Sequence, residues 1–334
     1  MPINLTLDAP ALLLAPMDGL TDAPMREVQG EAGAFTFAVS EFLRVSSEVL
    51  GRKEIRRDVP ELLTDGRTRS GLPVQVQILG GHPERMALSA RVAVEAGARA
   101  IDINFGCPAP TVNRHDGGAS LLKSPQRIKE IVQTVRAALP PDIPVSVKMR
   151  LGWDSMDPVH ENADMAAEGG AAWVTIHGRT RVQGYAPPAY WGPIGQVRAR
   201  LGIPVVANGD IWTLEDFRRC RDETGCRHFM LGRGALADPR LSARVARALG
   251  LPVRPQSGAE AVEEADGETD WVPRLRRLVE AIELMHGGPT RQTLSRLKQW
   301  LKLGSRYGTF AEFDSIKRAQ SVEELFATLC RSAE

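Results

Sequence analysis

The sequence predicts an α/β fold: a (β/α)8 TIM barrel with a small all-helical domain at the C-terminal end. Eight short apolar runs recur between residues 12 and 234, helical patterns fill most of the intervals, and only helical patterns follow residue 270. Near-continuous apolar strands are typical of parallel strands buried on both faces. A doubly wound open sheet is the alternative. The count of eight, and the lack of GxGxxG after the first run, favour the barrel.

Each predicted strand is an aliphatic or β-branched run that Gly, Pro, Asn or Asp closes. The strands are expected at 12–17, 35–42, 73–80, 100–108, 144–150, 173–180, 204–210 and 228–234. Helical patterns occupy 83–97, 124–139 and 213–225. Ser124-Pro125 and Asp238-Pro239 each provide a helix cap followed by proline, and Thr213 with Asp216 has the spacing of a capping box.

The composition is that of an ordinary folded protein. Of the 334 residues, 43% are hydrophobic and 25% are charged, and the net charge is +1, so a core can form and charge alone indicates no partner. No apolar run reaches the roughly 18 residues that a transmembrane helix needs. The four cysteines form no CxxC pair, which argues against a zinc or iron–sulfur site. We expect a cytoplasmic monomer without metal or membrane attachment.

The chain divides into three parts by composition. Residues 1–250 form the predicted barrel, which we expect to be the catalytic domain. Residues 251–270 hold six acidic residues between 260 and 270 and are predicted to be a linker. Residues 271–334 carry 11 Lys or Arg against 7 Asp or Glu, so they form a small basic helical domain.

Polar residues gather at the ends of the predicted strands, where a barrel places its active site. Asn208-Gly209-Asp210 and Gly232-Arg233-Gly234 follow the last two strands, a common phosphate-binding position. The glycines let backbone approach an anion and Arg233 can pair with its charge. The alternative is that both segments are only tight turns.

Two further side chains indicate chemistry. Lys148 lies within a strand that looks buried, with His177 on the next strand. Such a lysine could form a Schiff base, could stabilise negative charge on a reduced flavin, or could extend to solvent from the strand end. Cys107 begins a polar loop after the fourth strand. It could be a nucleophile, a proton donor or an inert residue. The other three cysteines fall on or beside helices and are expected to be structural.

These segments together resemble the tRNA-dihydrouridine synthase family. DINFGCP followed by VKMRLGWD and HGRT is specific, because generic phosphate-binding barrels do not share it. EFLRV (41–45), HGRTRVQGY (177–185) and LSRLKQWL (294–301) resemble the C-type subfamily, which acts on uridine 16 of the D-loop. The other matching pieces are LAPMDGLTD (14–22), SEF (40–42), VQxLG (76–80), GGASLL (117–122), NGDI (208–211) and GRGAL (232–236).

The resemblance implies an FMN enzyme that uses NADPH to reduce uridine in tRNA. Hydride would pass from N5 of FMN to C6 of the uracil, and Cys107 would protonate C5 from the opposite face. Lys148 and His177 would stabilise the reduced ring, and Gln77 would bond its pyrimidine edge. The remaining implied FMN contacts are Pro16, Met17, Asp18, Asn208, Gly209, Asp210, Gly232 and Arg233.

The basic tail and the family resemblance point to an RNA partner, with the target base extruded into the barrel mouth. The expected tRNA contacts are Arg44, Asn104, Tyr185, Arg296 and Lys298. Three alternatives stay open: a flavin barrel for a small pyrimidine, an aldolase-type barrel that uses Lys148, and a non-catalytic RNA-binding barrel. A small substrate would need no basic helical platform.

Overall fold

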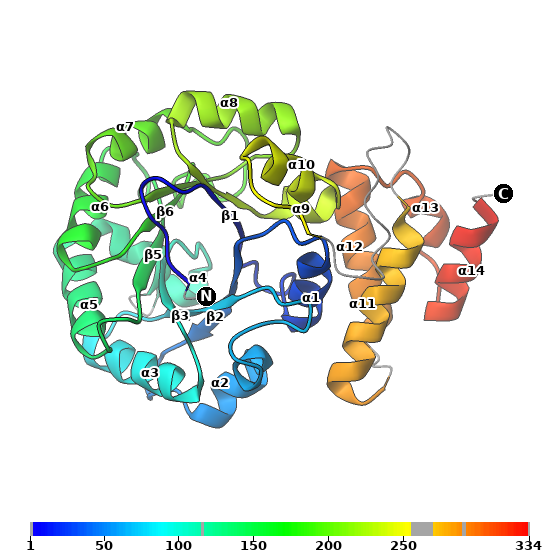
Figure 1. Cartoon of the computed structure of the whole chain (residues 1–334), viewed down its shortest axis with the longest axis horizontal. Helices are drawn as coiled ribbons and strands as arrows, with labels where there is room; N and C mark the ends of the chain where they lie inside the picture. Colours follow the sequence, from blue (N-terminus) through cyan, green and yellow to red (C-terminus); the bar gives the residue numbers. More distant parts are fainter. Residues whose placement is uncertain (1–2, 115–116, 255–269, 289–291, 333–334) are drawn as a thin grey trace.

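Eight parallel strands close into a barrel in the computed structural model, which describes residues 3–114, 117–254, 270–288 and 292–332 (Figure 1). Each strand pairs with the next along the chain, and β8 pairs with β1. The predicted (β/α)8 architecture is therefore confirmed. The strands are β1 Ala11–Leu14, β2 Phe37–Arg44, β3 Val74–Leu79, β4 Ile101–Phe105, β5 Val145–Arg150, β6 Val174–His177, β7 Val205–Asn208 and β8 His228–Leu231.

Helices surround the ring of strands (Figure 1). They are α1 Ala23–Glu31, α2 Arg52–Asp58, α3 Pro83–Ala96, α4 Pro110–Asn113, α5 Pro125–Ala137, α6 Val159–Glu168, α7 Gly192–Arg200, α8 Leu214–Thr224, α9 Arg233–Ala237 and α10 Leu241–Ala248, with 3-10 turns η1 Pro60–Leu63 and η2 Gly118–Lys123. The capping box of Thr213 and Asp216 begins α8 as predicted.

The two cap-and-proline predictions have different outcomes. Helix α5 begins at Pro125 as expected, but the Ser124 side chain makes no capping hydrogen bond. The prediction for Asp238-Pro239 is wrong by two residues, because α10 begins only at Leu241. The Asp238 carboxylate instead accepts from the backbone N–H of Arg240 at 3.0 Å, which closes a turn before the helix.

Apolar side chains fill the interface between the strands and the helices, whereas the barrel interior also holds buried polar side chains, among them Gln75, Asp102 and Ser146. Leu13, Phe37 and Trp173 belong to a buried cluster that the N-terminal segment joins through Ile3 and Leu5. In the described part of the chain, no helix is long and apolar enough to cross a membrane, and no group of three or more His, Cys, Asp or Glu could hold a metal ion.

The C-terminal segment is helical, as predicted, and packs on one side of the barrel. It comprises α11 Trp271–His286, α12 Thr293–Tyr307, α13 Phe313–Ile316 and α14 Val322–Ser332. Helix α11 lies against α1 and α12 against α9 (Figure 1). Trp271 meets Trp300 and Phe310 edge-on, with ring centroids 5.6 and 5.7 Å apart. The Trp300 indole donates to the Leu236 carbonyl at 2.9 Å, which fixes the tail to α9.

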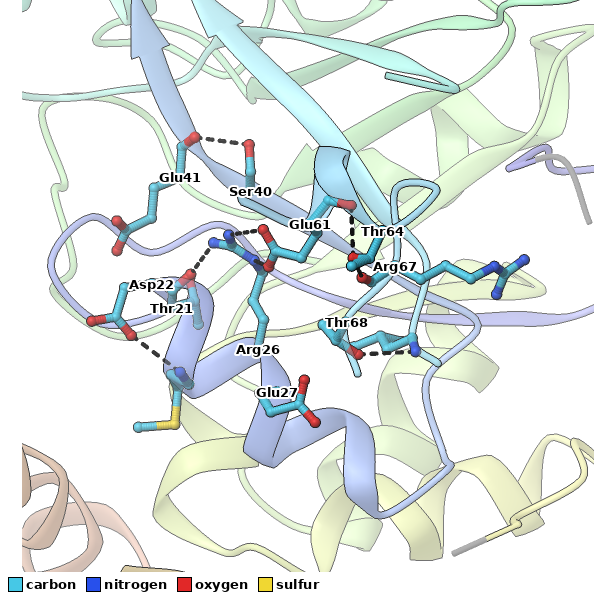
Figure 2. A network of polar contacts seen from close by, with 12 residues as sticks. Thr21, Asp22, Arg26, Glu27, Ser40, Glu41, Glu61, Thr64, Arg67 and Thr68 are labelled. Atoms are coloured by element: carbon cyan, nitrogen blue, oxygen red, sulfur yellow. Dashed lines mark hydrogen bonds and ion pairs between the residues drawn. The ribbon is translucent and has the colours of Figure 1, made fainter. Parts of the chain in front are cut away.

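A buried ion pair anchors α1 beneath the β1–α1 loop (Figure 2). Arg26 donates from Nε and Nη2 to the two carboxylate oxygens of Glu61, at 2.7 and 2.9 Å. Its Nη1 donates to the Thr21 carbonyl at 2.7 Å. The Thr21 hydroxyl in turn accepts from the backbone N–H of Met17 at 2.7 Å. The pair therefore holds the loop that carries Met17 to the barrel mouth.

Candidate active site

One cavity of about 630 Å³ opens at the C-terminal ends of the strands. That volume is within the usual range for a small-molecule or cofactor site. Every residue expected at the FMN site lines it, although these residues come from six of the eight strands or the loops after them. The predicted site residues at its wall are Pro16, Met17, Asp18, Gln77, Asn104, Cys107, Lys148, His177, Tyr185, Asn208, Gly209, Asp210, Gly232 and Arg233.

The basic centre of the cavity is Lys148, beside His177. Burial and, to a smaller extent, the neighbouring Arg150 charge lower the pKa of Lys148 to about 8. Its ammonium group donates to the Asn208 side-chain carbonyl at 3.3 Å. Burial and then the Arg150 charge hold the pKa of His177 well below its usual value, so the imidazole is neutral near pH 7. A cationic lysine and a neutral histidine thus face the same space, which suits a ligand that gains negative charge.

The ends of β7 and β8 form a second positive region. Asp210 pairs with the buried Arg179, and its other oxygen lies 3.9 Å from Arg233 Nη2. The Asp210 carboxylate therefore contributes to the site by holding two arginines. Gly209 has φ of +121°, and a side chain there would come within 3.0 Å of the His177 ring. Both the backbone conformation and the close packing explain glycine at this position.

Three aromatic rings surround the Arg233 guanidinium, and sequence reasoning identified only the first. Its central carbon lies 5.1 Å from the ring centre of Tyr185, 5.0 Å from that of Trp212 and 5.6 Å from that of Tyr307. Trp212 and Tyr307 stack with centroids 4.6 Å apart. Because Tyr307 ends α12, the C-terminal helices contribute directly to the wall around this cation.

The Cys107 thiol is half-buried at the cavity wall, and burial raises its pKa above the ordinary value. A thiol with a raised pKa stays protonated near neutrality, as a proton donor must. Its carbonyl accepts from the Ala119 N–H at 3.1 Å. Gly118 has φ of +61°, and a Cβ there would lie 2.9 Å from that carbonyl. Gly118 therefore allows this close packing behind the cysteine.

Arg150 in the VKMRLGWD motif and Asp102 in the DINFGCP motif have structural roles that the motifs alone did not indicate. Arg150 is buried and donates to the carbonyls of Gly106, Thr180 and Gly184 at 2.8 to 3.0 Å, so it ties the Cys107 loop to the loop that carries Tyr185. Asp102 on β4 is fully buried, and burial raises its pKa to about 6. Its position two residues before Asn104 is the available signal, because both side chains must face the same side of the strand.

The predicted tRNA contacts fall into two groups. Tyr185 and Asn104 line the cavity, and Arg44 is exposed at the end of β2, where its guanidinium donates to the Thr111 carbonyl at 3.0 Å. Arg296 instead pairs with Asp22 at 2.9 Å and donates to the carbonyls of Gly19 and Leu20. Its guanidinium is thus used to hold α12 against the β1–α1 loop.

Lys298 is also bonded within the protein. Its ammonium group donates to the Lys317 carbonyl at 2.9 Å and to the Ala319 carbonyl, at the end of α13. These contacts favour a structural role for Lys298 in the tail. One turn and two turns further along α12, Lys302 and Arg306 are exposed.

Comparison with known proteins identifies the family. The family model described as Dihydrouridine synthase (Dus) matches residues 13–270. The chain belongs to the dihydrouridine synthase family. The tRNA-dihydrouridine(16) synthase of Cupriavidus necator is 41% identical over 291 residues, covering 87% of this chain and 86% of that protein. The proteins of the same name from Ralstonia nicotianae and Haemophilus influenzae are 42% and 40% identical over 320 and 317 residues, covering 95% and 94% of this chain and 94% and 97% of the relatives.

Solved structures share the fold of this dihydrouridine synthase at low identity. Histamine dehydrogenase from Rhizobium sp. 4-9 has a TM-score of 0.57 and 16% identity, covering 74% of this chain and 47% of that one. 2-Naphthoyl-CoA reductase in complex with 2-naphthoyl-CoA has a TM-score of 0.55 and 13% identity, covering 71% and 50%. Membership of the family makes this protein an oxidoreductase, which decides against the aldolase-type and non-catalytic alternatives.

Proposed function

We propose that this enzyme reduces uridine 16 in the D-loop of tRNA to 5,6-dihydrouridine, with FMN as the bound hydride carrier and NADPH as the reductant. The observation that carries the proposal is the cavity in which the Cys107 thiol and the Lys148 ammonium group face one space. Relatives about 40% identical over most of the chain are named tRNA-dihydrouridine(16) synthases, which supports tRNA over a free pyrimidine.

The cavity fits an FMN in its size and in the chemistry of its wall. Arg233 and the glycine-rich ends of β7 and β8 offer positive charge and close backbone approach to a phosphate. Gln77 on β3 presents an amide that can bond the pyrimidine edge of the ring, and Lys148 with His177 would lie by its electron-rich side. Pro16, Met17 and Asp18, on the loop that Arg26 and Glu61 support, would close the other side.

When bound, FMN would supply hydride to C6 of the uracil after reduction by NADPH. The protein's own part is to orient the base and to provide the proton. Cys107, half-buried and protonated, would deliver that proton to C5. Burial lowers the pKa of Lys148 toward neutral pH, but the side chain keeps its positive charge at pH 7. Lys148 would therefore stabilise negative charge nearby.

The same proposal assigns the barrel, residues 1–250, to catalysis and the helical segment 271–334 to tRNA binding. The exposed candidates for contact are Arg44, Tyr185, Lys302 and Arg306, which lie on the barrel rim and on α12. Residues 255–269 of the predicted acidic linker 251–270 lie outside the described residues. Four free cysteines agree with a reducing cytoplasm as the place of action.

The test combines cofactor analysis with position mapping. Purified protein should be yellow, should release FMN on denaturation, and should form dihydrouridine in a tRNA transcript when NADPH is added. A control transcript with cytidine in place of uridine 16 should yield none. Modification at position 17 or 20 would contradict the position, and a colourless protein that cannot be loaded with FMN would contradict the cofactor.

A further inference from the structure

A chain of buried hydrogen bonds runs from the barrel interior to the Cys107 loop. The Gln77 amide nitrogen donates to Asp102 Oδ2 at 2.7 Å. The Asn104 amide nitrogen donates to the Gln77 carbonyl oxygen at 2.8 Å. The Asn104 carbonyl oxygen then accepts from the backbone N–H groups of Gly106 and Cys107, both at 2.9 Å. The side chains of Gln77, Asp102 and Asn104, which form this series of hydrogen bonds, are at least 90% buried.

Both ends of the chain require the same orientation of the two amides. At one end, two backbone N–H groups can be satisfied only by an oxygen, so Asn104 must turn its oxygen to the loop and its nitrogen to Gln77. Gln77 must then turn its own oxygen to Asn104 and its nitrogen inward. At the inner end, the Asp102 carboxylate can only accept, which matches that nitrogen. An amide flip at Gln77 would break two of these bonds, and one at Asn104 would break three.

Asp102 is itself held from the far side. The Ser146 hydroxyl donates to its Oδ1, and the Gln75 amide nitrogen donates to that hydroxyl at 2.9 Å. The Gln75 carbonyl oxygen is buried and has no hydrogen-bond partner among the described residues. It is therefore an unused acceptor on the side chain that contacts Ser146 through its nitrogen.

We propose that Asp102 is a positioning residue that fixes the place of the Cys107 thiol by setting the direction of the amide chain through Gln77 and Asn104. The proposal rests on the role of Cys107 as proton donor. In this proposal Asp102 contacts neither the uracil base nor the flavin ring. It acts through two side chains, and its requirement is for an oxygen acceptor at that point, not for a negative charge.

Two substitutions separate direction from charge. Asp102→Asn removes the charge but keeps an oxygen for Gln77, while its new amide can donate to Ser146. The Ser146 proton then goes to the Gln75 oxygen, which the Gln75 amide turns toward the hydroxyl by exchanging its nitrogen and oxygen. Asp102→Leu keeps the branched shape of the aspartate side chain, although its methyl groups are larger than the oxygens, and accepts nothing, so the Gln77 amide loses its inner partner. The Asn variant should behave as wild type and the Leu variant should not.

The first readout is alkylation of Cys107 by iodoacetamide, which needs neither flavin turnover nor tRNA. It is made in a Cys330→Ser background, because Cys330 is exposed whereas Cys220 and Cys226 are buried. A loosened loop exposes the thiol, so Asp102→Leu should be alkylated at least about threefold faster than the parent. The second readout is turnover, where kcat should fall about 10- to 100-fold at unchanged KM for tRNA.

Unchanged alkylation and kcat in Asp102→Leu would overturn the proposal. So would an Asp102→Asn variant as impaired as the Leu variant, because charge would then be the requirement. If the Leu variant does not fold, Asn104→Ser breaks the same chain beside the loop, and an alkylation rate equal to that of the parent would overturn the proposal equally. Full dihydrouridine formation by Cys107→Ala would refute the proton-donor role instead, while leaving the alkylation test valid.

Discussion

Removing Glu61 should destabilise the fold far more than removing a carboxylate that is paired at the same distance on the surface. Arg26 is fully buried and Glu61 is 6% exposed, and the pair is joined by two hydrogen bonds of 2.7 and 2.9 Å (Figure 2). Glu61→Leu leaves the guanidinium charge buried without its partner, which costs about 3–5 kcal/mol of unfolding free energy. With a urea m-value of about 3 kcal/mol/M, the unfolding midpoint should fall by about 1–1.7 M.

The matched control is Glu168→Ala. Glu168 contacts Lys129 at the same 2.7 Å, but the two side chains are 51% and 35% exposed, so the loss should be no more than about 1 kcal/mol. Arg26→Met combined with Glu61→Leu should recover most of the loss, because no unpaired charge remains. Urea unfolding followed by circular dichroism measures all three. Equal midpoints for Glu61→Leu and Glu168→Ala would refute the reasoning.

Three further predictions concern the site and its supports. Burial lowers the pKa of Lys148 to about 8, so the affinity of the apoprotein for FMN, measured by quenching of flavin fluorescence, should fall as pH rises through that value; a Lys148→Met variant with the same pH dependence would contradict this. Burial raises the pKa of Glu41 from 4.5 to about 7, so ionisation costs stability as pH rises through that interval. Glu41→Gln should therefore be more stable than wild type at pH 8, by up to about 3 kcal/mol of unfolding free energy, and should be as stable as wild type below pH 4.5. A difference in stability that does not change with pH would show another cause. Tyr307→Ala removes one of the rings around Arg233 and should raise the FMN dissociation constant about 3- to 10-fold, with Tyr307→Phe unchanged; equal loss in both variants would show that the hydroxyl is the important group.

The barrel fold, and the residues that line its cavity, could be predicted from short patterns in the sequence. Each strand is a run of buried apolar residues that ends at Gly, Pro, Asn or Asp, and parallel strand ends converge on one face of a closed barrel. Lys148 and Cys107 therefore had to approach each other although 41 positions separate them in the sequence. Neither inference needed the packing of helices.

What the sequence did not reveal depends on contacts between distant segments. Helical periodicity placed Arg296 and Lys298 on α12, but it carries no information about the carbonyl groups that face them, so both were expected to meet RNA. The stacking of Trp212 on Tyr307 requires α12 to pass beside α9. The start of α10 was misplaced because an aspartate before proline can close a turn as well as cap a helix.

The central claim, that Cys107 protonates the base while hydride arrives from a flavin, is tested most directly in a single turnover. Cys107→Ala holoenzyme, reduced beforehand and mixed with tRNA, should show flavin reoxidation at least about 100-fold slower than wild type, since a general acid contributes about 10²–10⁴ in rate. Its FMN content and tRNA affinity should equal those of wild type. Reoxidation at the wild-type rate, with dihydrouridine formed, would contradict the account.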